Sequence, residues 1–188
     1  MSWFRNSHDL YIAHQANSET ETTGLQNGKM SVIGLEELPG ALRPGQRLLG
    51  LDLGEKTIGL ALSDTLLTVA TPLKTLKRGK FKADAAEILS LIAEYGIGAI
   101  VVGWPLNMDG SEGPSAQSAR AFARNFAGAG VCPVVLVDER LSTAAVTRTL
   151  LDADTSRARR REVVDKMAAA YILQGALDRL RVLAGARK

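Results

Sequence analysis

The stretch Leu48-Leu49-Gly50-Leu51-Asp52-Leu53-Gly54, followed by Thr57-Ile58-Gly59-Leu60-Ala61-Leu62-Ser63, decides the fold expected for this chain. Two apolar runs separated by a short turn with a glycine predict a hairpin of two antiparallel strands. One carboxylate, Asp52, interrupts the first run. Because a buried charge is costly without a partner, Asp52 needs a cation, a cluster of hydrogen-bond donors or a metal ion. The simpler alternative, an aspartate bonded to a neighbouring backbone amide, stays open for this segment alone.

Length and composition are those of a single globular domain. The chain has 188 residues, of which 46% are hydrophobic and 23% are charged, and a chain of this size can bury a core of its own. No apolar run approaches the roughly 20 residues that a transmembrane helix needs, and the N-terminus lacks the pattern of a secretion signal. We therefore expect a cytoplasmic protein without a membrane partner.

Positive charge is concentrated in two windows, although the formal net charge is only +3. Clustered Lys and Arg are the electrostatic footprint of a polyanion partner such as nucleic acid. For a single cluster, a solvated helix start is the simpler explanation. The first window contains Lys74, Lys77, Arg78, Lys80 and Lys82, and the second contains Arg157, Arg159, Arg160 and Arg161.

Histidine and cysteine are scarce, and their scarcity limits the chemistry. The single cysteine, Cys132, excludes both a disulfide framework and a thiolate zinc site. Both histidines, His8 and His14, lie in the polar N-terminal tail. The remaining chain therefore has no histidine for Ser-His-Asp or Cys-His catalysis, and carboxylates are the obvious catalytic side chains.

The chain divides into two parts. Residues 1–46 are interpreted as an N-terminal extension and linker, largely disordered, because the first 29 or so are polar without periodicity and 38–46 are rich in Pro and Gly. Residues 47–188 form the folded domain. Their patterns predict strands at about 47–53, 57–63, 68–76, 97–103 and 133–137, and helices at about 81–95, from 114, from 142 or 143 to 151, and at 159–184. This order predicts an α/β fold with a five-stranded mixed sheet, three antiparallel strands plus two parallel, flanked by helices.

Acidic residues stand at three places that this fold would bring to one edge of the sheet. Asp138 and Glu139 end the last strand, Asp52 lies in the first strand, and Asp165 shares the core-facing stripe of the last helix. Ligands of such sheets bind at the carboxyl ends of the parallel strands. Converging carboxylates repel one another unless a cation lies between them. Oxygen ligands without histidine or thiolate favour Mg²⁺ or Mn²⁺ over zinc.

Ordinary ion pairs are the alternative to a metal site. Asp165 would then pair with Arg161, and Glu139 with Arg140.

Other polar residues are placed where they could bind phosphate: Lys56 and Thr57 at the first turn, Asn107 in the loop after the fourth strand, and the helix start at Ser142 and Thr143. The alternative to phosphate contact by Asn107 is that its side chain caps a turn.

Four ordered motifs together resemble the YqgF/RuvX family. They are Leu51-Asp52-Leu53-Gly54 with Ile58-Gly59-Leu60-Ala61, Val102-Gly103-Trp104-Pro105-Leu106-Asn107-Met108-Asp109-Gly110, Asp138-Glu139-Arg140-Leu141-Ser142-Thr143, and Val164-Asp165-Lys166-Met167-Ala168-Ala169. These are small bacterial proteins of the RNase H-like fold, described as Holliday junction resolvases or as nucleases maturing the 5′ end of pre-16S rRNA. The resemblance covers about residues 47–180. It implies that Asp52, Glu139 and Asp165 are catalytic and bind the metal, with Asp138 as a further ligand.

The leading hypothesis is a metal-dependent endonuclease, a phosphodiester hydrolase that processes the 5′ end of pre-16S rRNA in ribosome biogenesis. A Holliday junction resolvase acting on branched DNA, and a non-catalytic nucleic-acid-binding or phosphate-binding module, are the alternatives. An ATPase of the actin type also carries D-x-G in its first hairpin, but it needs two related subdomains. Association with ribosome assembly follows from the leading hypothesis, whereas monomer and homodimer both stay open. The predicted nucleic-acid contacts are Lys56, Thr57, Asn107, Arg140, Ser142, Thr143, Arg159, Arg160 and Arg161.

Overall fold

The computed structural model describes residues 32–141 and 159–186. One side of its sheet is an antiparallel meander of β2 (Arg47–Leu53), β3 (Thr57–Ser63) and β4 (Ala70–Lys77). Strands β5 (Ile97–Trp104) and β6 (Val134–Asp138) continue the sheet parallel to β2. The predicted mixed sheet, with three antiparallel strands extended by two parallel ones, is therefore confirmed.

The described part of the sheet has six strands, in the order β1-β6-β5-β2-β3-β4, where five were expected. The additional strand is β1 (Val32–Ile33), which pairs with β6 in parallel. A 3₁₀ turn, η1 (Leu35–Glu37), and a short helix, α2 (Leu38–Ala41), follow it, and Leu38 is fully buried. Part of the expected linker thus packs on the domain, whereas the prediction of disorder for residues 1–31 falls outside the described residues.

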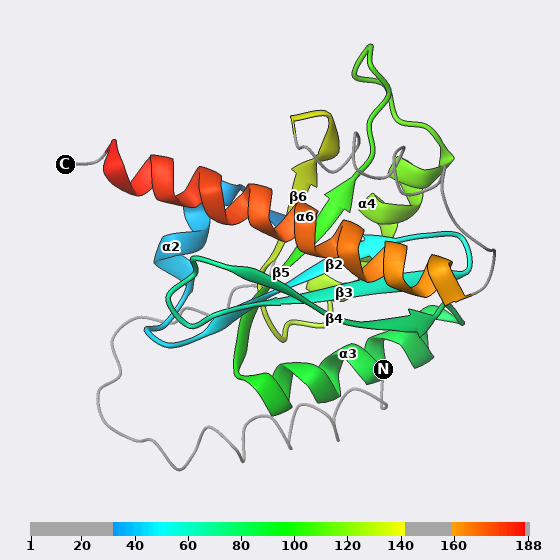
Figure 1. Cartoon of the computed structure of the whole chain (residues 1–188), viewed down its shortest axis with the longest axis horizontal. Coiled ribbons are helices and arrows are strands. Elements are labelled where there is room, and N and C mark those ends of the chain that lie inside the picture. Colours follow the sequence, from blue (N-terminus) through cyan, green and yellow to red (C-terminus); the bar gives the residue numbers. More distant parts are fainter. Residues whose placement is uncertain (1–31, 142–158, 187–188) are drawn as a thin grey trace.

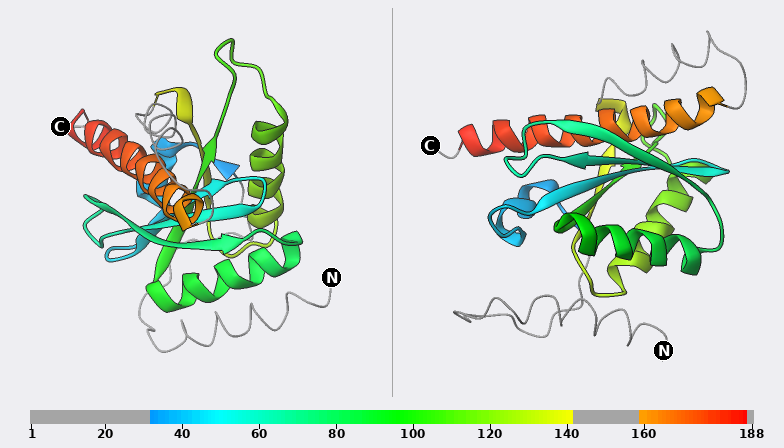
Figure 2. Two further views of the ribbon diagram at one scale, coloured as in Figure 1. Left: turned by 45° about the vertical axis from the view of Figure 1, so that its right-hand side comes forward. Right: turned by 60° about the horizontal axis from the view of Figure 1, so that its bottom comes forward.

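Helices cover both faces of the sheet. Figures 1 and 2 show α6 (Arg159–Gly185) lying across one face, with α3 (Phe81–Tyr95) and α4 (Pro114–Ala127) on the other. Strand β2 is buried on both faces, as its nearly unbroken apolar sequence requires. The helix predicted from residue 142 or 143 to 151 lies outside the described residues.

Small residues let α6 approach the sheet closely. A β-carbon added to Gly50 of β2 would lie 2.7 Å from Cβ of Leu173 and 3.0 Å from the carbonyl oxygen of Ala169. Ala168, Ala169 and Ile172 are buried, as the stripe on the last helix predicted. The close packing fixes where each residue of α6 lies over the strands.

The thiol of Cys132 is buried immediately before β6, and burial raises its pKa to about 12. The thiol therefore stays protonated at neutral pH and packs as a small apolar residue. None of the helices in the described residues is long and apolar enough to cross a membrane.

Candidate active site

Asp52 lies in the middle of a row of residues that crosses the sheet under α6. In the antiparallel pair, Asp52 is opposite Gly59 of β3. In the parallel pair, Leu51 is level with Val102 of β5, so Gly103 is the neighbour of Asp52 on that side. Paired residues in adjacent strands point to the same face of a sheet and lie about 4.8 Å apart. Asp52 is therefore flanked by two positions that have no side chain.

The backbone of Asp165 fills the space above Gly59. A β-carbon added to Gly59 would lie 2.0 Å from the carbonyl oxygen of Asp165 and 2.4 Å from its carbonyl carbon. No larger residue fits between β3 and α6 at this point. The glycine thus brings Asp165 to the strand next to Asp52.

The carboxylate of Glu139 fills the space above the other glycine. A β-carbon added to Gly103 would lie 2.4 Å from Oε1 of Glu139 and 2.6 Å from Cδ1 of Ile172. Glu139 is only 5% exposed and Asp52 is 7% exposed. Two buried carboxylates from β2 and the end of β6 thus approach each other under α6, with Asp165 on the far side of Asp52.

The side chain of Asp165 is held by Thr57. The Thr57 hydroxyl donates a hydrogen bond of 2.5 Å to Oδ2 of Asp165. Thr57 was predicted to contact a phosphate, but in the structure its hydroxyl orients the third acid. Thr57 lies two residues before Gly59 on β3. Residues 57 and 59 therefore point to the same face of the sheet, which explains why Thr57 reaches Asp165.

The donor set fits a hard divalent cation, because carboxylate oxygens are the ligands that Mg²⁺ and Mn²⁺ prefer. Asp52, Glu139 and Asp165 are gathered by the backbone around one row of the sheet. With the side chains as they stand, no three acidic, imidazole or thiol groups among the described residues are arranged to hold a metal ion. The bond from Thr57 keeps the Asp165 carboxylate in its present direction.

Asp138 has a different environment from the other acids. It is level with Trp104, which packs in the core on the side of α3 and α4, so its side chain lies on the face opposite Asp52. Arg140 forms a 2.7 Å ion pair with it. The hydrogen bonds from Arg140 are the main cause that lowers the pKa of the Asp138 carboxyl. The alternative pairing of Arg140 with Glu139 is not seen.

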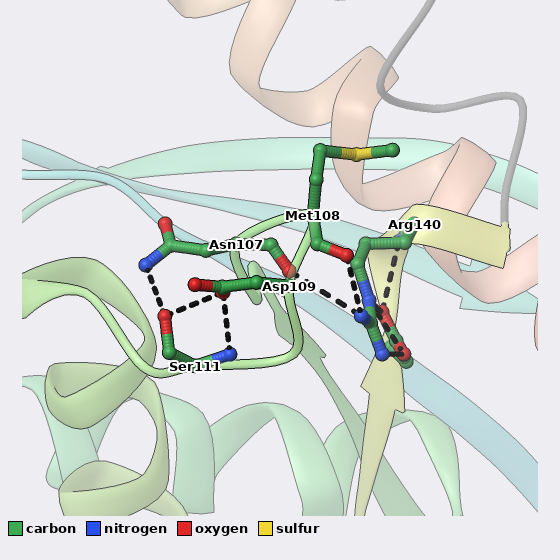
Figure 3. Close-up of polar contacts among 6 residues, drawn as sticks. Asn107, Met108, Asp109, Ser111 and Arg140 are labelled. Carbon is green, nitrogen blue, oxygen red and sulfur yellow. Dashed lines mark hydrogen bonds and ion pairs between the residues drawn. The ribbon is translucent and has the colours of Figure 1, made fainter.

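Arg140 also ties the loop after β5 to the end of β6. Its Nη1 donates to the carbonyl oxygens of Asn107 and Met108, at 3.3 and 3.4 Å, while Nε and Nη2 hold Asp138. Figure 3 shows these contacts beside a second network, in which Ser111 links Asn107 and Asp109. The Asn107 amide thus braces its own loop, in line with the turn cap that was the alternative to its predicted nucleic-acid contact.

The other predicted nucleic-acid contacts are less completely described. Lys56 is exposed at the turn between β2 and β3. Ser142 and Thr143 lie outside the described residues, as do the side chains of the three arginines at the start of α6. Arg159 to Arg161 form the first turn of α6, on the N-terminal side of Asp165.

Sequence reasoning missed the role of Arg78, which it assigned to a basic cluster. The Arg78 guanidinium donates to the carbonyl oxygen of Gly54 and, at 2.7 Å, to the hydroxyl of Ser118 on α4. Its backbone amide donates to the carbonyl oxygen of Lys56 at 2.8 Å. Arg78 therefore fixes the turn that follows Asp52. The one signal in the sequence was that Arg78 is an arginine among lysines, because a guanidinium carries several donors in a plane and an ammonium does not.

The mixed sheet flanked by helices is the fold that the family resemblance implies. Residues 46–179 match the RuvX family, described as Holliday junction resolvase, and the chain belongs to this family. A relative from Methylocella silvestris, named "Putative pre-16S rRNA nuclease", is 57% identical over 150 residues, which are 80% of this chain and 93% of the relative. A relative of the same name from Paramagnetospirillum magneticum is 58% identical over 149 residues, 79% of this chain and 96% of the relative. The expected class, a nuclease that hydrolyses phosphodiesters, is confirmed.

The solved structures that the chain resembles have low sequence identity to it. RuvC of T. thermophilus, in complex with a Holliday junction substrate, is 16% identical, with a TM-score of 0.43 over 72% of this chain and 96% of that one. The yeast mitochondrial Holliday junction resolvase Ydc2 is 13% identical, with a TM-score of 0.45 over 81% of this chain and 87% of that one.

Proposed function

We propose that this protein is an endonuclease that requires Mg²⁺ or Mn²⁺ and processes the 5′ end of precursor 16S rRNA in the cytoplasm. The observation that carries the proposal is the row Gly59–Asp52–Gly103, in which each glycine makes room for a further acid. The names of the curated relatives support the choice of substrate. Association with assembling ribosomal subunits follows from that substrate.

In this proposal, Asp52, Glu139 and Asp165 hold the cation. Asp52 and Glu139 are buried, so their oxygens are shielded from solvent on the protein side. Asp165 would be the third ligand, and the hydrogen bond from Thr57 would orient its carboxylate. A bound cation supplies Lewis acidity, which activates a water and stabilises the leaving oxygen of the phosphodiester. Asp138 is left out of the proposed set because Arg140 occupies it on the opposite face.

Branched DNA is the second candidate substrate. The family description, Holliday junction resolvase, favours it. Carboxylates that hold a cation against a phosphodiester act on the backbone shared by RNA and DNA, so the acids serve either substrate. The choice between the two must come from the surface around the acids.

The test compares a precursor 16S rRNA fragment carrying its 5′ leader with a four-way DNA junction, each incubated in Mg²⁺ and in chelator. Asp52→Asn and Asp165→Asn are expected to reduce cleavage about 100-fold or more, the scale on which a positioned catalytic group contributes. Asp178→Asn is the matched control, because Asp178 lies on the same helix but is exposed and contacts Gln174 and Arg181. It should cleave like the wild type.

The outcomes separate the candidates. Preferential cleavage of the RNA supports the proposal, and preferential cleavage of the junction supports the second candidate. Cleavage that persists in Asp52→Asn would refute the assignment of the acids. Binding without cleavage, indifferent to Mg²⁺, would favour a non-catalytic module.

A further inference from the structure

Lys77, the last residue of β4, lies beside Thr57, the residue that bonds Asp165. It pairs with Thr57 of β3, so the two side chains point to the same face of the sheet. That face is the one covered by α6, because the Thr57 hydroxyl bonds Asp165 of α6. Lys77 is therefore one strand spacing, about 4.8 Å, from the residue that holds the third acid.

The neighbouring lysine of the same strand is directed the other way. Lys74 pairs with Leu60, whose side chain belongs to the core under α3. The Lys74 ammonium forms a 2.9 Å ion pair with Glu87 of α3. Lys77, in contrast, is exposed and has no ion pair with any residue in the described ranges. The basic window in the sequence thus divides between the two faces of the sheet.

The position of Lys77 is fixed by its surroundings. The next residue, Arg78, donates its backbone amide to the carbonyl oxygen of Lys56, and its guanidinium anchors Gly54 and Ser118. The exposed residues Lys56 and Lys77 therefore stand together at the end of the hairpin. Glu55 is the only acid in this turn.

A polyanion that reaches the acids needs positive charge next to them, because the carboxylates alone repel its phosphates. We infer that Lys77 binds a phosphate of the nucleic-acid backbone beside the cleaved bond, with Lys56 contributing charge at the same end. A lysine ammonium is a compact charge that suits phosphate contact without reading base sequence. This inference rests on the proposed function and names the residue that holds the substrate against the acids.

The test measures binding of the same RNA leader fragment as a function of salt, in the absence of divalent cations so that no cleavage occurs. One lost phosphate contact lowers the slope of log K against log salt by about 0.7–0.9. Lys77→Gln is expected to show this lower slope. Converted to affinity over one decade of salt, the lower slope corresponds to binding that is about 5- to 8-fold weaker at 0.1 M salt. Lys77→Arg should retain the wild-type slope, because it keeps the charge.

Lys74→Gln is the matched control, since it removes the same charge from the same strand on the opposite face. Its slope should equal that of the wild type. Equal slopes for Lys77→Gln and Lys74→Gln would overturn the inference, and would leave the proposed function intact if Asp52→Asn still abolished cleavage. A wild-type protein that neither binds nor cleaves the RNA would overturn both. Melting temperatures of the variants verify that each is folded.

Discussion

Thr57 donates its hydroxyl to the carboxylate of Asp165, although 108 positions separate the two residues in sequence. The bond joins the first hairpin of the sheet to the last helix at the point where the acids gather. It gives Asp165 a fixed direction in the free protein. Removal of the hydroxyl therefore tests whether the orientation of this acid matters for cleavage.

Thr57→Val, which keeps the shape and removes the hydroxyl, is expected to lower kcat about 10- to 100-fold, as loss of a group that orients a metal ligand does. Thr57→Ser retains the hydroxyl and should stay within a few-fold of the wild type. Steady-state cleavage at several Mg²⁺ concentrations measures both variants. An unchanged kcat for Thr57→Val, with only KM raised, would instead support a direct contact between Thr57 and the substrate.

Gly59→Ala is expected to destabilise the fold. The added β-carbon meets backbone atoms of Asp165 at 2.0 and 2.4 Å, so the helix must move as a whole. Overpacking of this kind costs about 1–3 kcal/mol or more in free energy of unfolding. Gly40→Ala is the control, because a β-carbon there meets nothing within 4 Å. Urea unfolding should separate the two, and equal midpoints would contradict the close contact between β3 and α6.

Gly103→Ala is expected to affect activity more than stability. Its β-carbon would meet two side-chain atoms, Oε1 of Glu139 and Cδ1 of Ile172, and side chains can move aside more easily than a helix backbone. The carboxylate of Glu139 is then displaced from the side of Asp52. We expect a fall in kcat of about 10-fold or more with a smaller loss of unfolding free energy than in Gly59→Ala. Full activity of Gly103→Ala would remove Glu139 from the proposed set.

Asp64 makes the turn between β3 and β4 sensitive to acid. Its carboxylate accepts from the hydroxyl and amide of Thr68, both at 2.6 Å, and from the amide of Val69 at 3.0 Å. These bonds, led by the Thr68 hydroxyl, lower the pKa of Asp64 to about 2. Because the folded pKa is below the unfolded value, the stabilisation is complete above about pH 4 and is lost as the pH falls toward 2.

Asp64→Asn should therefore lower the stability at neutral pH and flatten the decline between about pH 4 and 2. The measurement is the urea midpoint of unfolding at a series of pH values. Glu55→Gln, at the other hairpin turn, is the control and should keep the wild-type decline. A decline in Asp64→Asn as steep as that of the wild type would assign the acid sensitivity to other carboxylates.

The sequence predicted the central strands well because their signal is strong. Strands β2 and β3 have the predicted bounds, since long apolar runs ended by a glycine turn leave little choice. Strand β1 was missed because two residues carry no periodicity, and its pairing with β6 is a tertiary contact. The edge strand β4 begins two residues later than expected, because the turn held by Asp64 extends to Val69.

The candidate site was predicted in part. The side chains of Asp52 and Glu139 were expected at one edge and lie there, whereas Asp138 alternates to the opposite face, where Arg140 bonds it. The role of Gly59 was not recognised, although a glycine inside a strand is a known sign of close backbone approach. The bond between Thr57 and Asp165 depends on how α6 is seated, and no local pattern records that.

Helix α6 carries Asp165 and also shields residues such as Leu48 and Val101 on its face of the sheet. Detachment of this helix would scatter the acids and expose a hydrophobic surface in the same step. Loss of activity and exposure of hydrophobic surface are thus two consequences of the same event, the cooperative detachment of α6. A form of the protein in which α6 is detached would lack Asp165 beside Gly59, and with it the third acid of the proposed nuclease centre.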